Sequence, residues 1–179
     1  MPATIRVSWY GGQTSPEPSG ANAESGIKFS RDDNQNTGGT PVPIPTSTGT
    51  NYSYYKLLAF EVTATAATAI SNRRVYLNSS LTTGLYLFFQ DQATYTQPTN
   101  GNRPADVTSS NGATPSGYTA LTATTLGGAH LWDNTSTSCS STGRKGNFCQ
   151  IVAGVGNNYA GGASSATALS DLKFAYDEA

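Results

Sequence analysis

Short runs that alternate between apolar and polar residues, separated by dense groups of turn-forming residues, constrain this chain more than any other feature. In residues 4–10, Ile5, Val7 and Trp9 share one face of an extended strand, and polar side chains share the other. Comparable runs recur along the sequence and end in stretches rich in Gly, Pro, Asn and Asp. No segment gives a strong helical pattern. The sequence therefore predicts an all-β protein, folded as a β-sandwich or a jelly-roll-like variant of one.

The 179 residues fit a single domain, because no internal repeat and no linker divides them. We therefore predict one β-sandwich domain over residues 1–179. Three long loops are expected within it, at residues 11–26, 31–50 and 91–117. The third is rich in polar residues, and loops of this length are usually functional, contact-making or disordered.

Residues 52–63 form the most apolar run, in which only Lys56 interrupts the face made by the even-numbered positions. Both faces are fairly apolar, which predicts a central strand or a subunit contact. The runs at 73–80 and 85–91 are expected to pair with each other across a turn, and residues 85–89 to lie centrally.

Weaker patterns complete the expected strands. Ile27 and Phe29 indicate a second short strand, and the three prolines of residues 41–45 indicate an extended edge segment. Near the C-terminus, Leu172, Phe174 and Tyr176 are predicted to face inward from a last strand.

The composition argues against several classes of function. Ser, Thr, Gly and Asn account for 77 of the 179 residues, only 12% are charged, and there is one histidine. Enzymes usually need clustered groups that move protons, attack or hold metal. A net charge of −1 without a basic cluster argues against nucleic-acid binding. No run is long and apolar enough to span a membrane, and the N-terminus is predicted to be the first strand rather than a signal peptide.

Two serine–lysine pairs have the spacing of a nucleophile motif, Ser53 with Lys56 and Ser170 with Lys173. That motif needs a helix, on which positions three apart share a face, whereas these pairs lie in strand patterns. His130 lacks a recognisable partner for a triad. We therefore predict no catalytic residue, no cofactor and no enzyme activity.

Metal chemistry is equally weakly indicated. Asp32, Asp33 and Asn34 lack the rest of a calcium-binding loop and are predicted to form a capped turn. Cys139 and Cys149 flank a Gly-rich loop and either form a disulfide or remain independent thiols, since spacing alone does not decide between them. No metal site is predicted.

Exposed aromatic residues could stack on sugars or on a partner protein. Tyr95 and Trp132 both lie near predicted loops and are the candidates for exposed contacts. The alternative for the aromatic residues as a group is packing in the core or at an interface.

Three segments carry a resemblance to a known family: IKFSRDDN at 27–34, PVPIP…GTNYSYYKLLAFEV at 41–62 and KFAYDEA at 173–179. In this order and approximate spacing, the chain resembles a family of tailed-bacteriophage virion structural proteins. The similarity is weaker over residues 91–165, and the two cysteines are not part of the pattern.

The resemblance implies a structural component of a phage virion, above all a capsid decoration (cement) protein that binds and stabilises the assembled head. The alternative is a neck, tail or fibre component with a receptor- or glycan-binding role. The expected partners are the major capsid protein or other virion proteins, together with further copies of the chain in a homo-oligomer such as a trimer. The expected location is the virion, after synthesis in the host bacterial cytoplasm, with no nucleic-acid or membrane partner.

Overall fold

The computed structural model describes residues 2–12, 17–23, 27–33, 39–161 and 172–179. Within these ranges it contains eleven strands and one short 3₁₀ helix, with the following bounds: β1 Thr4–Tyr10, β2 Ala21–Asn22, β3 Thr50–Tyr52, β4 Lys56–Ala64, β5 Ala69–Leu77, β6 Leu85–Gln92, β7 Thr119–Ala120, η1 Leu126–Gly128, β8 His130–Asp133, β9 Thr137–Ser138, β10 Gly143–Gly156 and β11 Leu172–Glu178. No helix in this part of the chain is long and apolar enough to cross a bilayer.

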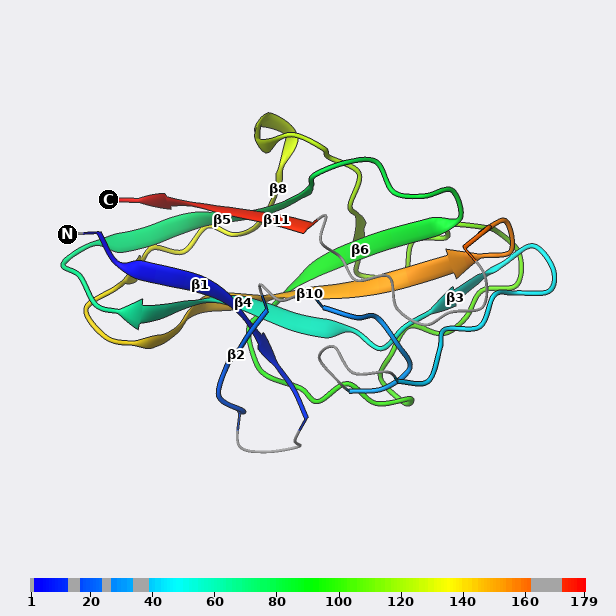
Figure 1. Cartoon of the computed structure of the whole chain (residues 1–179), viewed down its shortest axis with the longest axis horizontal. Coiled ribbons are helices and arrows are strands. Elements are labelled where there is room, and N and C mark those ends of the chain that lie inside the picture. Colours follow the sequence, from blue (N-terminus) through cyan, green and yellow to red (C-terminus); the bar gives the residue numbers. More distant parts are fainter. Residues whose placement is uncertain (1, 13–16, 24–26, 34–38, 162–171) are drawn as a thin grey trace.

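The strands form two antiparallel sheets, so the predicted all-β sandwich is confirmed. The larger sheet has the order β2-β1-β4-β10-β6-β7, and β3 pairs with the far end of β10. The smaller sheet has the order β11-β5-β8, and β9 also pairs with β5. In Figure 1, β5 and β11 of the smaller sheet run alongside β1 of the larger one, and both chain ends lie at the same end of the molecule.

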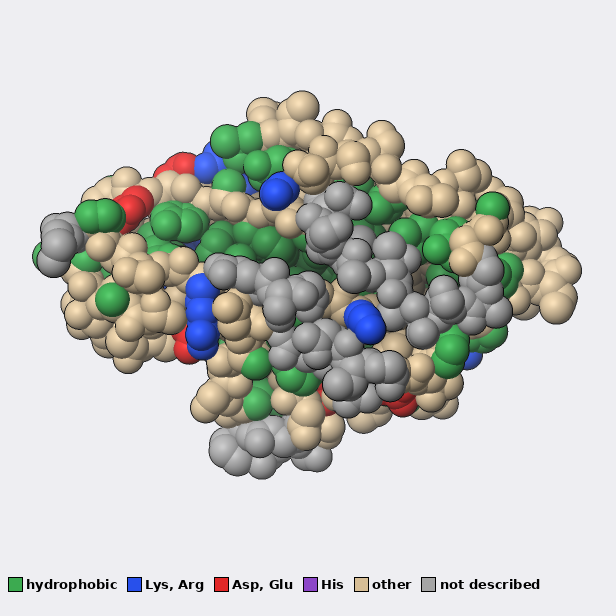
Figure 2. Space-filling view, viewed as in Figure 1, with side chains coloured by type: hydrophobic (Ala, Val, Ile, Leu, Met, Phe, Trp, Pro, Cys, Tyr) green, Lys and Arg blue, Asp and Glu red, His purple; other side chains and the backbone are tan. Residues whose placement is uncertain are grey.

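The main core lies between the two sheets, where alternating residues of their strands meet. Phe60 of β4 stacks on Trp132 of β8, with ring centroids 5.6 Å apart, and Phe174 of β11 meets both rings edge-on. Figure 2 shows hydrophobic side chains in the band between β1 and β11. Leu172, Phe174 and Tyr176 pack against this core, as their alternation predicts.

A buried ion pair also lies within the sandwich. Arg73 of β5 donates from Nη1 to Asp133 Oδ2 at 3.0 Å, and the two side chains are 0% and 2% exposed. Asp133 also accepts hydrogen bonds from the backbone N–H groups of Thr135 and Asn147, at 2.8 Å each. Gly146 lies at a register shift of β10 with φ of 77°, where a Cβ would collide with the Arg73–Asp133 pair. A glycine is therefore required where β10 passes this pair.

The prediction that residues 73–80 and 85–91 pair with each other is wrong. β5 belongs to the smaller sheet and β6 to the larger one, where β6 pairs with β10 and β7. The connection between them ends in a turn in which Leu85 N–H donates to Thr82 O and Gly84 has a φ of 82°. Both strands are apolar on their inner face, and sequence patterns alone do not separate neighbours within a sheet from neighbours across a sandwich.

The run at 52–63 is interrupted as well. β3 ends at Tyr52 and β4 begins at Lys56, because the two strands pair with different stretches of β10. Residues 27–29 do not belong to a named strand, contrary to the prediction of a short strand there. Residues 41–45 also lie outside the named strands. Ile27 and Phe29 are nevertheless buried in the main core.

Candidate interaction surface

The outer face of the seven-stranded sheet, away from the smaller sheet, carries a second apolar cluster. Its buried members are Tyr10, Tyr52, Tyr55, Leu57, Ala59, Phe88, Phe148 and Val152. An apolar sheet face must be covered to be stable in water. Residues 93–118, the connection between β6 and β7, provide this cover together with neighbouring segments, and we call them the loop layer. Tyr95, Val107 and Tyr118 of the loop layer pack against the cluster.

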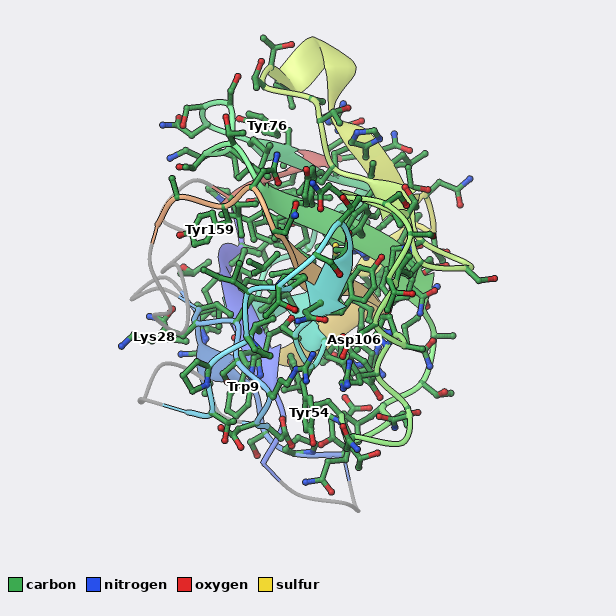
Figure 3. All side chains as sticks on the ribbon, turned by 90° about the vertical axis from the view of Figure 1, so that its right-hand side faces the viewer. Trp9, Lys28, Tyr54, Tyr76, Asp106 and Tyr159 are labelled. Atoms are coloured by element: carbon green, nitrogen blue, oxygen red, sulfur yellow. The ribbon has the colours of Figure 1, made fainter. Side chains whose placement is uncertain are left out.

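Asp106 is the main polar anchor of the loop layer. Its Oδ1 accepts the backbone N–H of Tyr52 at 2.9 Å and Arg103 Nη1 at 2.9 Å. Its Oδ2 accepts Arg31 Nη2 at 2.6 Å and Arg103 Nη2 at 3.2 Å. Burial would raise the pKa of the Asp106 carboxyl, but hydrogen bonds from Arg103, Tyr52 and Arg31 outweigh it and hold that pKa below its ordinary value. Figure 3 shows Asp106 beside the cyan segment that contains β3.

Two tyrosines of the second apolar cluster donate to carbonyl groups of the loop layer. Tyr52 Oη donates to Ala113 O at 2.5 Å, and Tyr55 Oη donates to Thr96 O at 3.1 Å. Burial is the largest cause of the raised pKa of both phenols. Both hydroxyls therefore remain protonated donors at neutral pH.

Backbone pairing and an asparagine fix the middle of the layer. Thr50 and Val107 exchange two backbone hydrogen bonds, of 2.7 and 2.9 Å. Asn111 Oδ1 accepts the N–H groups of Gly49 at 3.1 Å and Asn157 at 3.2 Å. Residues 93–118 contain no named strand but make many defined contacts, so the loop layer presents a fixed surface.

An open cavity of about 410 Å³ lies between the loop layer and the sheet. Gln90 and Gln150, which are cross-strand partners of β6 and β10, contribute to its lining. Gln150 donates to the Tyr118 hydroxyl. Burial raises the Tyr118 pKa to about 12, against a smaller opposing effect of the Gln150 hydrogen bond. The cavity presents amide and hydroxyl groups beside the side chains of Pro104 and Pro115, an arrangement suited to neutral hydrogen-bonding partners.

Lys56, which interrupts the apolar face in the sequence, is fully buried. Its Nζ donates to Asp32 O at 3.0 Å and lies 5.9 Å from the ring centroid of Trp9. Burial lowers the Lys56 pKa to about 8, although Asp33 and Asp32 act in the opposite direction. The segment that contains Asp32 thus lies over the buried amine of Lys56.

The remaining candidates for catalysis and metal binding are not brought together. Ser53 Oγ donates to Tyr54 O at 2.7 Å and accepts the N–H of Ala153 at 3.0 Å, so its hydroxyl supports the backbone. Ser170 lies outside the described residues. His130 packs against Phe89, with ring centroids 5.1 Å apart. In the part of the chain that the structure describes, no three His, Cys, Asp or Glu side chains could share a metal ion.

The exposed-contact role predicted for Trp132 is wrong. Trp132 is 5% exposed, and its indole N–H donates to Asn147 O at 3.3 Å. The cause is the local structure, since residues 130–133 form a strand of the smaller sheet in which Trp132 and Asp133 are both buried, at a register shift in its pairing with β5. Tyr95 is partly buried and meets Phe148 at 6.4 Å between ring centroids, so it supports the loop layer from within.

Cys139 and Cys149 are both free and fully buried. They belong to the main core between the sheets, where burial, followed by the charge of Asp91, raises the pKa of the Cys149 thiol well above its ordinary value. Such thiols behave as small apolar side chains with low reactivity.

The residues that fix the loop layer escaped prediction from the sequence. Asp106 stands in an ordinary turn-forming stretch, and its partners Arg31 and Tyr52 are 75 and 54 residues away. The one available signal is indirect: the odd-numbered positions Tyr55, Leu57 and Ala59 are fairly apolar, so this part of the outer face needs a cover.

In comparisons with known proteins, no curated protein and no solved structure matches the chain. A family model described as the Mtd second domain matches residues 52–155, more than half of the chain. The match runs from the end of β3 almost to the end of β10, and so includes the central strands and the whole loop layer.

The family match corrects the predictions that rested on the resemblance. The family found is not the one that the resemblance named, so the virion role as a decoration protein, its neck, tail or fibre alternative and the virion location are withdrawn. The exclusion of enzyme activity is withdrawn as well, because the match gives it no support. Self-association stays a prediction. By a match over more than half of its length, the chain belongs to the Mtd second-domain family.

Proposed function

We propose that the chain is an interaction domain, in which the two-sheet scaffold holds the loop layer as a contact surface for another protein. The observation that carries this proposal is the way in which the layer is held. Asp106 joins the backbone of β3 to Arg31 and Arg103, so three separate segments meet at one carboxylate.

An irregular cover needs apolar contacts and also hydrogen-bond partners for its buried backbone groups. The loop layer has both: Tyr95, Val107 and Tyr118 pack against the cluster, and hydrogen bonds fix the layer along its length. Fixing an irregular segment before binding reduces the entropy that is lost when a partner docks. Binding surfaces are commonly carried by loops on a rigid scaffold.

The cavity beside the layer supplies the recognition chemistry. Gln90, Gln150 and Tyr118 offer neutral donors and acceptors, and Arg103 is paired with Asp106, which also binds Arg31. This surface is suited to a polar patch of a partner that offers hydrogen-bonding groups. The family description, a second domain, is consistent with a module that works beside others.

The test uses a photo-crosslinking amino acid at Ser116, an exposed residue that lines the cavity. The matched control is Ala67, which is exposed in the short connection between β4 and β5. We expect a discrete cross-linked protein from position 116 in cells that express the full chain, and none from position 67.

The identified partner then allows an affinity measurement by calorimetry. We expect Ala105→Arg, which places a large charged group at the cavity, to weaken binding by at least about tenfold. Ala67→Arg, the same substitution away from the cavity, should leave the affinity unchanged. Equal cross-linking from both positions, no cross-linking at all, or an unaffected Ala105→Arg variant would each overturn the proposal.

A further inference from the structure

The chain contains two asparagines that directly precede a glycine, Asn100 before Gly101 and Asn111 before Gly112, and both pairs lie in the loop layer. Such an asparagine is chemically labile in water, because the backbone nitrogen of the glycine can attack the side-chain carbonyl carbon without hindrance from a Cβ. In a folded protein, the rate of this attack depends on how firmly the side chain and the glycine backbone are held. The two pairs differ in this respect.

Asn111 is held firmly. Its Oδ1 accepts the N–H groups of Gly49 at 3.1 Å and Asn157 at 3.2 Å, and its Nδ2 donates to Asn157 Oδ1 at 2.7 Å. Gly112 is half-buried with a φ of 69°, and a Cβ placed there would lie 2.5 Å from the Tyr86 ring. The Asn111 side chain must therefore break these hydrogen bonds before its carbonyl carbon can turn towards the Gly112 nitrogen.

Asn100 is held much less firmly. Asn100 and Gly101 are both exposed. They lie in a turn in which the N–H groups of Asn102 and Arg103 donate to Thr99 O, at 3.4 and 3.1 Å. Among the described residues, a Cβ at Gly101 would meet only Thr99 Oγ1, at 3.9 Å, so the glycine stands in open space. Within the same part of the chain, the Asn100 side chain makes a single hydrogen bond, from Arg103 Nε to its Oδ1 at 3.1 Å.

This hydrogen bond favours attack on the Asn100 side chain. A guanidinium that donates to Oδ1 draws electrons from the side-chain carbonyl and stabilises the negative charge that develops on this oxygen during the attack. The bond involves Oδ1 alone, so it does not hold the Nδ2 group that must leave. Asn100 thus combines an exposed side chain, an unhindered neighbouring nitrogen and an adjacent cation.

We propose that Asn100 is a site of spontaneous modification, at which the folded protein converts the asparagine to aspartate and isoaspartate. The Gly101 nitrogen loses its proton and forms a bond to Cγ of Asn100, and the Cγ–Nδ2 bond breaks. The side-chain amide takes up the proton and leaves as ammonia, so a cyclic succinimide remains. Water then opens the ring, at Cγ to give aspartate or at the backbone carbonyl carbon to give isoaspartate, in which the main chain runs through Cγ.

The product changes the anchor of the loop layer. The new carboxylate lies beside Arg103, which also binds Asp106. Isoaspartate adds a methylene to the main chain inside the turn, so the N–H groups of Asn102 and Arg103 lose their register with Thr99 O. Both residues line the cavity beside the loop layer. The reaction needs no partner protein, so its test is independent of the partner contact proposed above.

The test follows the purified full chain during incubation in mildly alkaline buffer, by peptide mass spectrometry that separates the amide from the acid at each asparagine. We expect Asn100 to convert at least about tenfold faster than Asn111, because Asn111 must break at least one further hydrogen bond, which is worth about this factor in rate. In urea, where the contacts of Asn111 are lost, the two should convert at similar rates. An isoaspartate-specific methyltransferase should label the product at Asn100.

Gly101→Ala is the matched variant, because its Cβ hinders attack by the backbone nitrogen and the open space around Gly101 accommodates it. It should slow conversion at Asn100 by at least about tenfold and leave Asn111 unchanged. Equal rates at Asn100 and Asn111 in the folded chain, no conversion at Asn100 while the unfolded chain converts, or an unslowed Gly101→Ala variant would each overturn the proposal.

Hydrogen exchange tests the effect on the anchor. The isoaspartyl chain should lose protection across residues 93–118 relative to Asn100→Asp, which supplies the charge without the extra methylene. Equal protection in the two chains would show that the longer main chain leaves the turn intact and would overturn this part of the proposal.

Discussion

The two faces of the seven-stranded sheet are covered in different ways. The inner face meets another sheet, so regular strands supply alternating apolar residues, and burial of apolar surface provides most of the stability. The outer face meets the loop layer, where apolar contacts are supplemented by bonds from side chains to backbone, such as Tyr52 to Ala113 and Asp106 to Tyr52.

This difference shows what each kind of cover requires. A strand satisfies its own backbone in the ladder, so it needs only the correct alternation of residues. An irregular segment has no ladder, and its backbone groups must find side-chain partners individually. The inner cover, which is the four-stranded sheet, should therefore unfold together with the seven-stranded sheet when a substitution destabilises it. The outer cover, which is the loop layer, should unfold locally.

The largest effect is expected at the buried ion pair of the inner core. Asp133→Ala leaves the Arg73 charge buried without its partner and removes the acceptor of two backbone N–H groups. We expect the free energy of unfolding to fall by about 3–5 kcal/mol, measured by urea denaturation. Arg6→Ala, which removes a partly exposed pair with Glu61, should cost less than about 1 kcal/mol. Similar losses in the free energy of unfolding for Asp133→Ala and Arg6→Ala would contradict the expectation that the buried ion pair contributes more than the partly exposed one.

Lys56 should make stability depend on alkaline pH. Its pKa is lowered to about 8 in the folded protein, so the unfolded chain binds more protons between this value and the ordinary lysine pKa of 10.5. The free energy of unfolding should therefore rise with pH from about 8 towards 10. Above about 10 the buried tyrosines, whose pKa values are raised, act in the opposite direction.

Lys56→Met is the matched variant for this effect, because methionine fills a similar volume without a charge. We expect the rise in stability between pH 8 and 10 to disappear in Lys56→Met, as measured by urea denaturation at a series of pH values. A wild-type protein with no such rise would show that Lys56 keeps its proton when buried.

Asp106 tests the outer cover directly. Asp106→Ala removes the acceptor shared by Tyr52, Arg31 and Arg103, and charge-assisted bonds of this kind contribute about 1.5–3 kcal/mol each to the local structure. Hydrogen exchange should accelerate across residues 93–118 and at β3, whereas the amides of β5 and β10 stay protected. Uniform acceleration throughout the chain would show that the two covers unfold together.

The same carboxylate predicts an acid response. Its folded pKa is lowered, so its contribution is present above the ordinary aspartate pKa and is lost as pH falls through the folded value. The protection factors of the loop layer, which correct for the slower intrinsic exchange of amides in acid, should therefore fall at acid pH in the wild type. In Asp106→Asn that fall should be smaller, because the asparagine side chain does not titrate in this range.

The difference between the strand cover and the loop cover also explains how much could be predicted from the sequence. Alternation identified the fold class, the inward face of β1 and the inward residues of β11, because each depends on a local period of two. Alternation did not assign β5 and β6 to different sheets, since that choice depends on the path of the connection. It also left Trp132 near a loop, where the actual strand is only four residues long.

The candidate surface was harder to predict from the sequence than the fold, for a physical reason. Residues 91–117 were expected to form a long loop, and residues 93–118 do connect β6 to β7; a function for this loop stays a prediction. The anchors of the layer, however, pair residues separated by more than 50 positions, and an aspartate in a turn looks the same whether or not an arginine meets it. The resemblance to virion proteins rested on short architectural motifs, and the family match has replaced it.

The smallest effect should come from a single neutral hydrogen bond of the outer cover. Tyr55→Phe removes the donor to Thr96 O, at 3.1 Å, and keeps the ring that packs on the sheet. We expect a loss of about 1 kcal/mol, seen first as faster exchange near residue 96. Tyr76→Phe removes a hydroxyl from the smaller sheet and should leave that region unchanged. If Tyr55→Phe instead lowered the stability of the whole chain and left exchange near residue 96 unaltered, the loop layer would be part of the cooperative core, and the distinction between the two covers would fail.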